Sequence, residues 1–357
     1  MAQNQRATKP MTTPGLDDRS RDVLKSLIQL HIATGQPVGS ETLARMFQRS
    51  VSSATLRNIM ADLERLGYLT HPHTSAGRMP TDEGYRVYVD TLMRHEPLPA
   101  RDAAVISSEM RELDASPNQV MEHASHVLSK HSGNVGFVLV PDMAGTTFRH
   151  VDLVRLPHPR ILVVLVARTG LVTNKVIEVE DQLTQDELQA CANYLNTHFA
   201  GLDLAAIRGR LLELMSREKA LYDSLLKNVV AVGGRAFAGQ GEPDLFLDGT
   251  SNMLDQREFD DADRMRGVFK AFEEKSRLVK ILNACLSERG VRIVIGQENP
   301  DPALRGTAMV VASCPVDGEM GWGLGVVGST RMEYARMIAL VEHVATALNQ
   351  TLKDLRP

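Results

Sequence analysis

Apolar side chains recur at helical spacing in three short segments within residues 17–95. The first segment carries one apolar stripe made of Val23, Leu24, Leu27, Ile28 and Ile32. Gly35 then predicts a helix C-terminus. A second segment covers residues 40–47, with Ser40 as its predicted N-cap, and a third extends to residue 66, followed by Gly67. Three helices joined by such short turns indicate a small helical domain.

The third segment, predicted to be capped by Ser52 or Ser53, has two faces of different chemistry. At about 100° per residue, the face opposite the apolar one carries Ala54, Arg57, Asn58, Ala61 and Arg65. Small side chains allow close approach to base edges, Arg can bond guanine bidentately, and Asn can do the same for adenine. The helix N-terminus, with Ser52, Ser53 and Thr55, can hold a backbone phosphate. Arg57 and Asn58 alone would still favour an ordinary solvated helix face.

The loop after this helix favours a DNA-binding interpretation. Residues 68–70 predict a short strand, and residues 71–81 predict a loop rich in Pro and Gly that exposes His71, His73 and Arg78. A loop in this position is typical of a wing, which reaches phosphates or a minor groove, and Arg78 is its expected probe. With a closing helix at residues 82–93, the pattern predicts a winged helix over residues 17–95.

Charge and composition narrow the choice between classes of function only slightly. The formal net charge is -4; residues 1–95 carry +3, from 12 Lys and Arg against 9 Asp and Glu, so charge alone is a weak sign of nucleic-acid binding. No apolar run approaches the roughly 20 residues that span a bilayer, and the polar residues 1–16 predict a disordered tail rather than a signal peptide. Three widely spaced cysteines indicate buried, reduced thiols in a cytoplasmic protein.

The remaining two-thirds predict an α+β region of more than one part. Strand patterns fall at residues 135–140, 147–155, 161–167, 171–179, 291–295, 307–313 and 323–327. Helical patterns fall at residues 183–199, 202–230 and 334–355. The order is strands, then a mainly helical segment, then strands again. This order indicates a mixed sheet domain interrupted by an insertion.

We find no constellation of residues that predicts catalysis, a cofactor or a metal. Residues 323–328 satisfy G-x-G-x-x-G, but the chain has no following strand and acidic residue that a dinucleotide site needs, so we expect a tight strand-to-helix turn. His123, His126 and His131 fall on a predicted helix without a nearby Cys, which favours a solvated face over a zinc site. The sequence therefore predicts a protein that is not an enzyme.

Several motifs resemble those of the HrcA family, the bacterial heat-inducible transcription repressors. In the N-terminal part they are Pro37-Val38-Gly39-Ser40, Ser52-Ser53-Ala54-Thr55-Leu56-Arg57-Asn58, Leu63-Glu64-Arg65-Leu66-Gly67-Tyr68-Leu69, Pro72-His73-Thr74-Ser75-Ala76-Gly77-Arg78, Pro80-Thr81 and Gly84-Tyr85-Arg86-Val87-Tyr88-Val89-Asp90. Nearer the C-terminus they are Ile295-Gly296-Gln297-Glu298-Asn299 and the run from Gly323 to Tyr334.

The resemblance implies a GAF-like sheet domain built from residues 100–200 and 263–357, with an inserted, largely helical dimerisation domain at residues 201–262. It also implies a homodimer that binds an inverted-repeat operator in double-stranded DNA, the CIRCE element of chaperonin and DnaK-operon genes. The GroE chaperonin would keep the repressor active until heat diverts the chaperonin to unfolded clients, and the protein would lie in the cytoplasm with the nucleoid.

The residues expected to contact DNA are Ser52, Ser53, Ala54, Thr55, Arg57, Asn58, Arg65, His73 and Arg78. Two other functions remain open from the sequence. One is a ligand-sensing regulator whose GAF-like domain binds a metabolite. The other is an enzyme with an appended DNA-binding module, which no catalytic motif supports.

Overall fold

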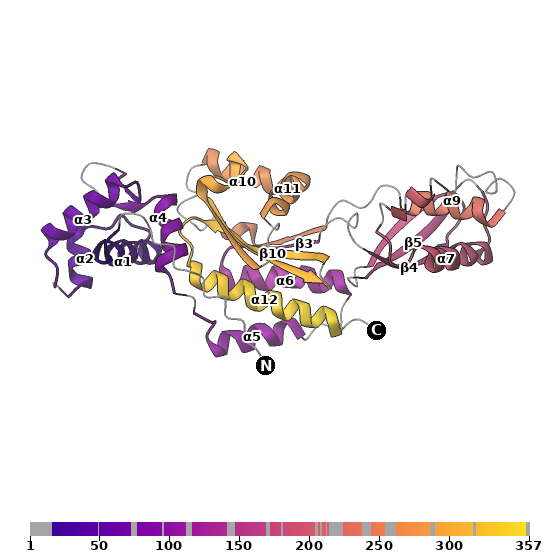
Figure 1. The fold of residues 1–357 in the computed structure, drawn as a ribbon, viewed down its shortest axis with the longest axis horizontal. Coiled ribbons are helices and arrows are strands. Elements are labelled where there is room, and N and C mark those ends of the chain that lie inside the picture. The colour runs from indigo at the N-terminus through magenta and orange to yellow at the C-terminus, as the bar shows by residue number, and fades with distance from the viewer. Residues whose placement is uncertain are drawn as a thin grey trace.

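A computed structural model describes most of the chain between residues 16 and 354. The segments outside the described part are residues 1–15, 49, 73–76, 95, 112–115, 141–146, 169–171, 180, 204–205, 208, 212, 214–223, 238–243, 254–261, 286–289, 317–318 and 355–357. The tail predicted for residues 1–16 lies almost wholly outside this part. Figure 1 shows three bodies along one axis: an N-terminal helical domain, a central domain and a lobe at the opposite end.

The N-terminal domain contains the elements predicted for a winged helix. They are α1 (Asp18–Thr34), α2 (Ser40–Met46), α3 (Ser53–Arg65), β1 (Leu69–Thr70), β2 (Met79–Pro80), α4 (Asp82–Val87) and the π-helix η1 (Tyr88–Leu92). Gly35 ends α1 in the left-handed conformation, at φ 66°, as predicted. The apolar stripes meet in one core, whose fully buried members include Leu24, Leu27, Ile28, Leu43, Leu56 and Leu63.

The central domain is built on a five-stranded sheet in the order β7-β3-β10-β9-β8. Its strands are β3 (Val135–Val140), β7 (Asp244–Asp248), β8 (Gly290–Ile295), β9 (Thr307–Val316) and β10 (Glu319–Ser329). Each neighbouring pair is antiparallel, so the prediction of a mixed sheet was wrong. The motif at residues 323–328 lies inside β10, rather than in the tight turn that we expected.

Helices cover both faces of this sheet (Figure 1). On one face lie α5 (Ala100–Arg111), α6 (Pro117–Ser132) and α12 (Tyr334–Asp354); on the other lie α10 (Ala262–Glu273) and α11 (Lys275–Cys285). Every residue of β3 is buried, because alternate side chains enter the two layers. Phe137, for example, packs in the cluster that contains α10 and α11, whereas Val138 packs in the other.

The lobe has its own three-stranded antiparallel sheet, β4-β5-β6. Its elements are β4 (Phe148–Arg155), β5 (Arg160–Ala167), β6 (Val172–Glu178), α7 (Gln185–Phe199) and α9 (Ser224–Ala236). The strands at 147–179 therefore leave the central sheet, although we had assigned residues 100–200 to one sheet domain. The insertion starts before β4 rather than at residue 201, and β7 returns the chain to the central sheet within the predicted 201–262 span.

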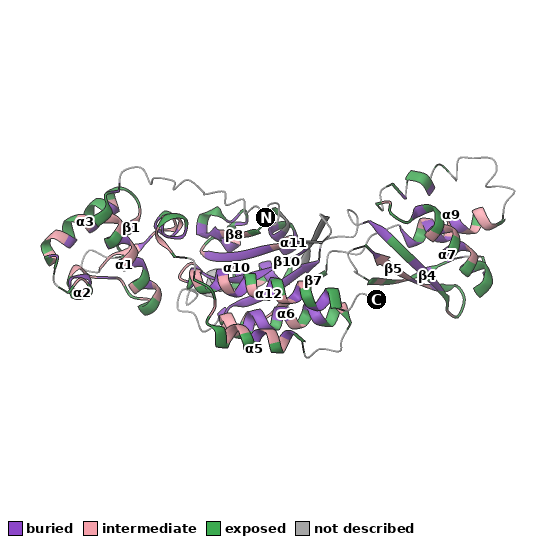
Figure 2. Ribbon diagram, turned by 60° about the horizontal axis from the view of Figure 1, so that its bottom comes forward, coloured by how far each residue is buried: buried purple, intermediate pink, exposed green. Residues whose placement is uncertain are grey.

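Burial follows this division into bodies. Figure 2 shows buried residues concentrated on the central strands and on the inner sides of the helices around them. Two cysteines, Cys191 on α7 and Cys314 on β9, are buried and form no disulfide, as the sequence indicated. Burial raises the pKa of Cys191 to about 11 and that of Cys314 to about 12, so both thiols stay protonated at neutral pH.

Candidate nucleic-acid interface

Helices α2 and α3 form the two halves of a helix-turn-helix. A hydroxyl pair joins them, because Ser40 Oγ and Ser53 Oγ lie 3.0 Å apart. Gly39, rather than Ser40, occupies the N-cap position of α2, and Gly39 makes no side-chain capping bond. The Ser40 hydroxyl thus fixes the position of α3 against α2 instead of capping its own helix.

Ser52 is the N-cap of α3, which settles the choice between Ser52 and Ser53. The Thr55 amide donates to Ser52 Oγ at 3.1 Å, and the two hydroxyls of Ser52 and Thr55 lie 2.8 Å apart. This cap provides a hydrogen-bond acceptor for one of the first backbone amides of the helix, which have no acceptor within the helix, and it orders the first turn. Ser52 is exposed, and Ser53 and Thr55 are partly exposed, so this end of α3 faces solvent.

The two faces of α3 are divided as the helical spacing predicted. Leu56, Met60 and Leu63 are buried. The opposite face exposes Ala54, Arg57, Asn58, Ala61 and Arg65. Arg65 forms an ion pair with Asp62 one turn earlier, so its guanidinium would have to exchange that partner before it could bind a phosphate or a base. Arg57 and Asn58 are exposed on this face and can read base edges bidentately.

The wing begins as a short β-ribbon beside α3. β1 pairs with β2 in antiparallel register, and Val38 and Arg78 extend the pairing by mutual backbone bonds of 2.8 and 2.9 Å. Gly77 permits this approach, since a Cβ at that position would lie 2.5 Å from the backbone of Val38. His73, one of the residues expected to contact DNA, lies outside the described residues.

Glu64 of α3 holds the base of the wing. Its carboxylate forms an ion pair with Arg78, with Oε2 2.8 Å from Arg78 Nε, and also a short contact with His71 Nδ1. The Arg78 side chain is only 25% exposed, so the expectation of a freely exposed Arg78 was wrong. Glu64 carries no sequence signal for this role, because its contact with a residue 14 positions away depends on how the wing folds back.

The histidines of α6 are held by neighbours of several kinds. His131 contacts the Glu109 carboxylate at 3.1 Å, His126 contacts Asp248 at 3.1 Å, and His123 contacts the backbone oxygen of Glu109 at 3.2 Å. Within the described residues, no group of three or more His, Cys, Asp or Glu side chains is arranged to hold a metal ion. None of the helices described in the structure is long and apolar enough to cross a membrane.

A helix-turn-helix, a wing and an exposed polar helix face, attached to a separate α/β body, define a winged-helix DNA-binding regulator. Residues 15–92 match the family described as winged helix-turn-helix transcription repressor, HrcA DNA-binding, and residues 118–338 match the HrcA protein C terminal domain. The chain belongs to the HrcA family of heat-inducible transcription repressors, which are not enzymes.

The similarity to known proteins extends over nearly the whole chain. The heat-inducible transcription repressor HrcA of Geobacter sulfurreducens is 39% identical over 95% of this chain and 98% of its own length. The protein of the same name from Syntrophobacter fumaroxidans is 37% identical over the same shares of the two chains. A solved structure described only as a hypothetical protein has the same fold, with a TM-score of 0.59 and 20% identity over 95% of this chain and 99% of that one.

Proposed function

We propose that two copies of this chain repress transcription by binding an inverted-repeat operator through their α3 helices. The observation that carries this proposal is the exposed face with Ala54, Arg57 and Asn58. Small residues at the first turn allow the helix to enter a major groove, and the two longer side chains then reach base edges. The N-terminus of α3 adds Ser52, Ser53 and Thr55 for phosphate contacts, the same face adds Arg65, and the wing adds His73 and Arg78.

Support for a homodimer comes from the outer face of the lobe's sheet. Val154, Leu162 and Val176 form one row across β4, β5 and β6, and Val166 and Val172 form the apolar part of another. Val154, Val172 and Val176 are 43%, 39% and 51% exposed, whereas α7 and α9 cover the inner face. A sheet face of this kind is normally buried against a partner, and we assign a second copy of the chain to it.

The operator in this proposal is the CIRCE inverted repeat, and the GroE chaperonin is the partner that maintains the active repressor. Repression in the cytoplasm, at the nucleoid, would lapse when heat diverts the chaperonin. The central domain would be the GAF-like body that joins the DNA-binding and dimerising parts. These assignments rest on membership in the HrcA family and on the motifs that carry it.

A titration of labelled DNA with purified protein tests the proposed DNA binding. We expect specific binding to an inverted-repeat operator to be at least about 10³-fold tighter than binding to scrambled DNA of the same length, with two chains per operator. Equal affinity for the two DNAs would contradict the proposal. An Arg101→Ala variant is the matched control, since Arg101 is an exposed arginine on α5 of the central domain.

A heating experiment tests the proposed regulation. Operator binding should fall after modest heating of the purified protein and should return when GroE and ATP are added. A GroE preparation without ATP controls for simple protection by added protein. Binding that survives the heat-shock range, or that recovers equally without chaperonin, would remove GroE from the mechanism while leaving the operator binding intact.

A further inference from the structure

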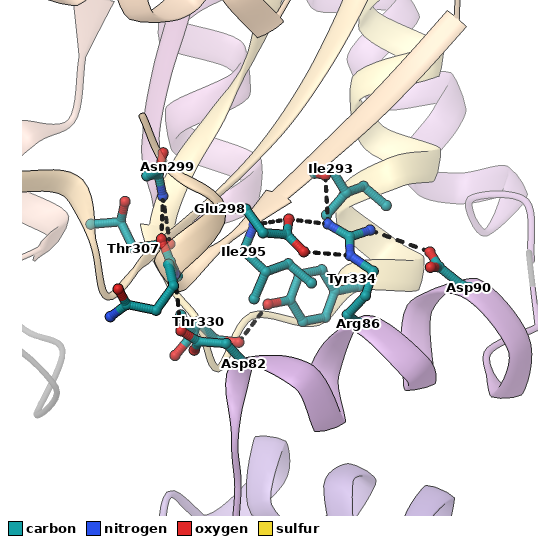
Figure 3. Close-up of polar contacts among 12 residues, drawn as sticks. Asp82, Arg86, Asp90, Ile293, Ile295, Glu298, Asn299, Thr307, Thr330 and Tyr334 are labelled. Atoms are coloured by element: carbon teal, nitrogen blue, oxygen red, sulfur yellow. Dashed lines mark hydrogen bonds and ion pairs between the residues drawn. The ribbon is translucent and has the colours of Figure 1, made fainter. Parts of the chain in front are cut away.

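The winged helix is joined to the central domain by charged contacts at one side of their junction (Figure 3). Arg86 of α4 donates from Nε to Glu298 Oε1 at 2.7 Å, and from Nη2 to the Ile293 backbone oxygen at 2.8 Å. Its Nη2 also contacts Glu298 Oε2, and its Nη1 contacts Asp90 at 3.2 Å. The planar guanidinium therefore uses all of its nitrogens and defines an orientation, which a flexible point charge would not do.

The central-domain side of this contact is fixed as well. Glu298 accepts from the Ile295 amide at 2.9 Å, which holds the carboxylate on the short helix η6 (Gly296–Glu298). Asp82, at the start of α4, accepts from the Gln297 amide at 2.9 Å. Gly296 makes room for this approach, because a Cβ there would overlap the Asp82 carboxylate. Helix α4 is thus bound at two points to one turn of the central domain.

A second arginine makes the reverse connection. Arg331 follows β10 of the central domain and donates from Nη1 to the Ile32 backbone oxygen of α1 at 2.8 Å. Its guanidinium lies against Gly35, where an added Cβ would be 3.2 Å from Arg331 Cζ. The rings of Tyr85 on α4 and Tyr334 on α12 add an apolar contact across the junction: they lie 5.9 Å apart, and both residues are buried. The contacts span α1 and α4, so they restrain rotation as well as separation.

We propose that Arg86, Glu298 and Arg331 are positioning residues that set which spacing between operator half-sites the repressor accepts. The proposal rests on the dimer and the inverted repeat of the proposed function. The spacer is the DNA between the two half-sites of the operator. Each base pair added to it shifts the second half-site by about 3.4 Å and rotates it by about 35°. A dimer whose recognition helices are held rigidly binds such a mismatched operator more weakly. A dimer whose junctions between the winged helix and the central domain are loosened can adapt to it.

The test measures binding of full-length variants to operators whose spacer is lengthened or shortened by one, two and five base pairs, and to a single half-site. The loosened variants are Arg331→Ala and the double variant Glu298→Ala/Arg331→Ala. The conservative double variant Glu298→Gln/Arg331→Lys keeps an acceptor and a donor at these positions. Arg305→Ala is the control, since Arg305 is an exposed arginine of the central domain.

With spacers changed by one or two base pairs, we expect a loss of roughly tenfold or more for the wild type and of only about two- to threefold for the loosened variants. A change of five base pairs turns the second half-site to the opposite side of the duplex, so it should reduce the affinity of every variant to that for a single half-site. Affinity for the single half-site should be unchanged in every variant, which also shows that the winged helix is folded. The conservative double variant should keep most of the wild-type preference.

A wild-type spacing preference in both loosened variants would overturn the positioning role. So would a fall in half-site affinity that accounts for the whole change. If the wild type binds no inverted repeat more tightly than a half-site, the proposed function itself fails, and that outcome is visible before any variant is compared.

Discussion

The two ends of the molecule, which lie on opposite sides of the central domain in Figure 1, differ in what their exposed surfaces present. At the N-terminal end, α3 exposes Arg57 and Asn58, and ion pairs such as Arg86–Glu298 connect the domain to the body. At the other end, the lobe exposes a valine-rich sheet face. One end suits a polyanion and the other suits an apolar partner, so in the proposed function DNA binding and self-association would use separate surfaces.

The strongest test of this comparison places charges on the sheet face. Val154→Asp/Val176→Asp should convert the dimer to a monomer, because two carboxylates would have to be buried without partners. Operator affinity should then fall by about 10² or more, since the second half-site no longer binds within the same complex. Light scattering after size-exclusion chromatography and an operator titration measure the two effects.

The control for this experiment is Gln189→Glu/Asn193→Asp, which adds the same charge to the exposed face of α7 in the same lobe. It should remain a dimer with unchanged affinity. If the valine variant also remains a dimer, self-association does not use this sheet face, and the contrast between the two ends loses its functional meaning.

The second test removes the reading side chains at the other end. Arg57→Ala or Asn58→Ala should each cost about 1–3 kcal/mol of operator affinity and relax the base preference at one position in each half-site. The dimer should be unaffected, as measured by light scattering. Competition with operators carrying single base changes distinguishes lost readout from a general loss of binding. Unchanged affinity in both variants would show that α3 does not read the operator.

The local parts of this interface could be predicted from the sequence, because helix periodicity places Leu56, Met60 and Leu63 on one side and Arg57 and Asn58 on the other. Caps and turns at Ser52, Gly35 and Gly67 are equally local signals. The strand limits of β3 and β5 were predicted within one residue for the same reason.

The parts that could not be predicted depend on contacts between distant segments. Alternating apolar residues identify β4 as a strand but do not say which sheet it joins, and this is why the insertion was placed too late in the chain. Glu298 lies 212 positions from Arg86, and nothing in either motif identifies the other as its partner. Glu64 likewise became part of the interface only through the fold of the wing.

The third test concerns Arg78 and Glu64. Arg78→Ala should weaken binding to all DNA sequences alike. It should also lower the slope of log K against log salt concentration by about one, as expected for one lost phosphate contact. Glu64→Gln should act in the opposite direction, strengthening binding by about two- to threefold, because it removes a negative charge near the DNA and releases Arg78.

Both variants are measured by titration at several salt concentrations, with operator and scrambled DNA. A change confined to the operator would mean that Arg78 reads bases rather than phosphate. Weaker DNA binding by Glu64→Gln would mean that the ion pair is needed to order the wing. The structure of the wing would then contribute more to DNA affinity than its charge does.

The smallest expected effect lies in the body between the two ends, where Glu109 of α5 contacts Lys130 at 2.8 Å and His131 at 3.1 Å on α6. The hydrogen bond from Lys130, helped by His131, lowers the pKa of Glu109 below its usual value. A carboxyl group with a lowered folded-state pKa stabilises the fold above its unfolded pKa of about 4.3 and loses that contribution as the pH falls through the folded value. Glu109→Gln should therefore lower Tm slightly at pH 7, and the difference from the wild type should vanish at acid pH, below the lowered folded-state pKa of Glu109. Operator affinity and dimer mass at 25 °C should not change, since neither surface is touched; a loss of either would mean that the body, and not only the two ends, carries part of the function.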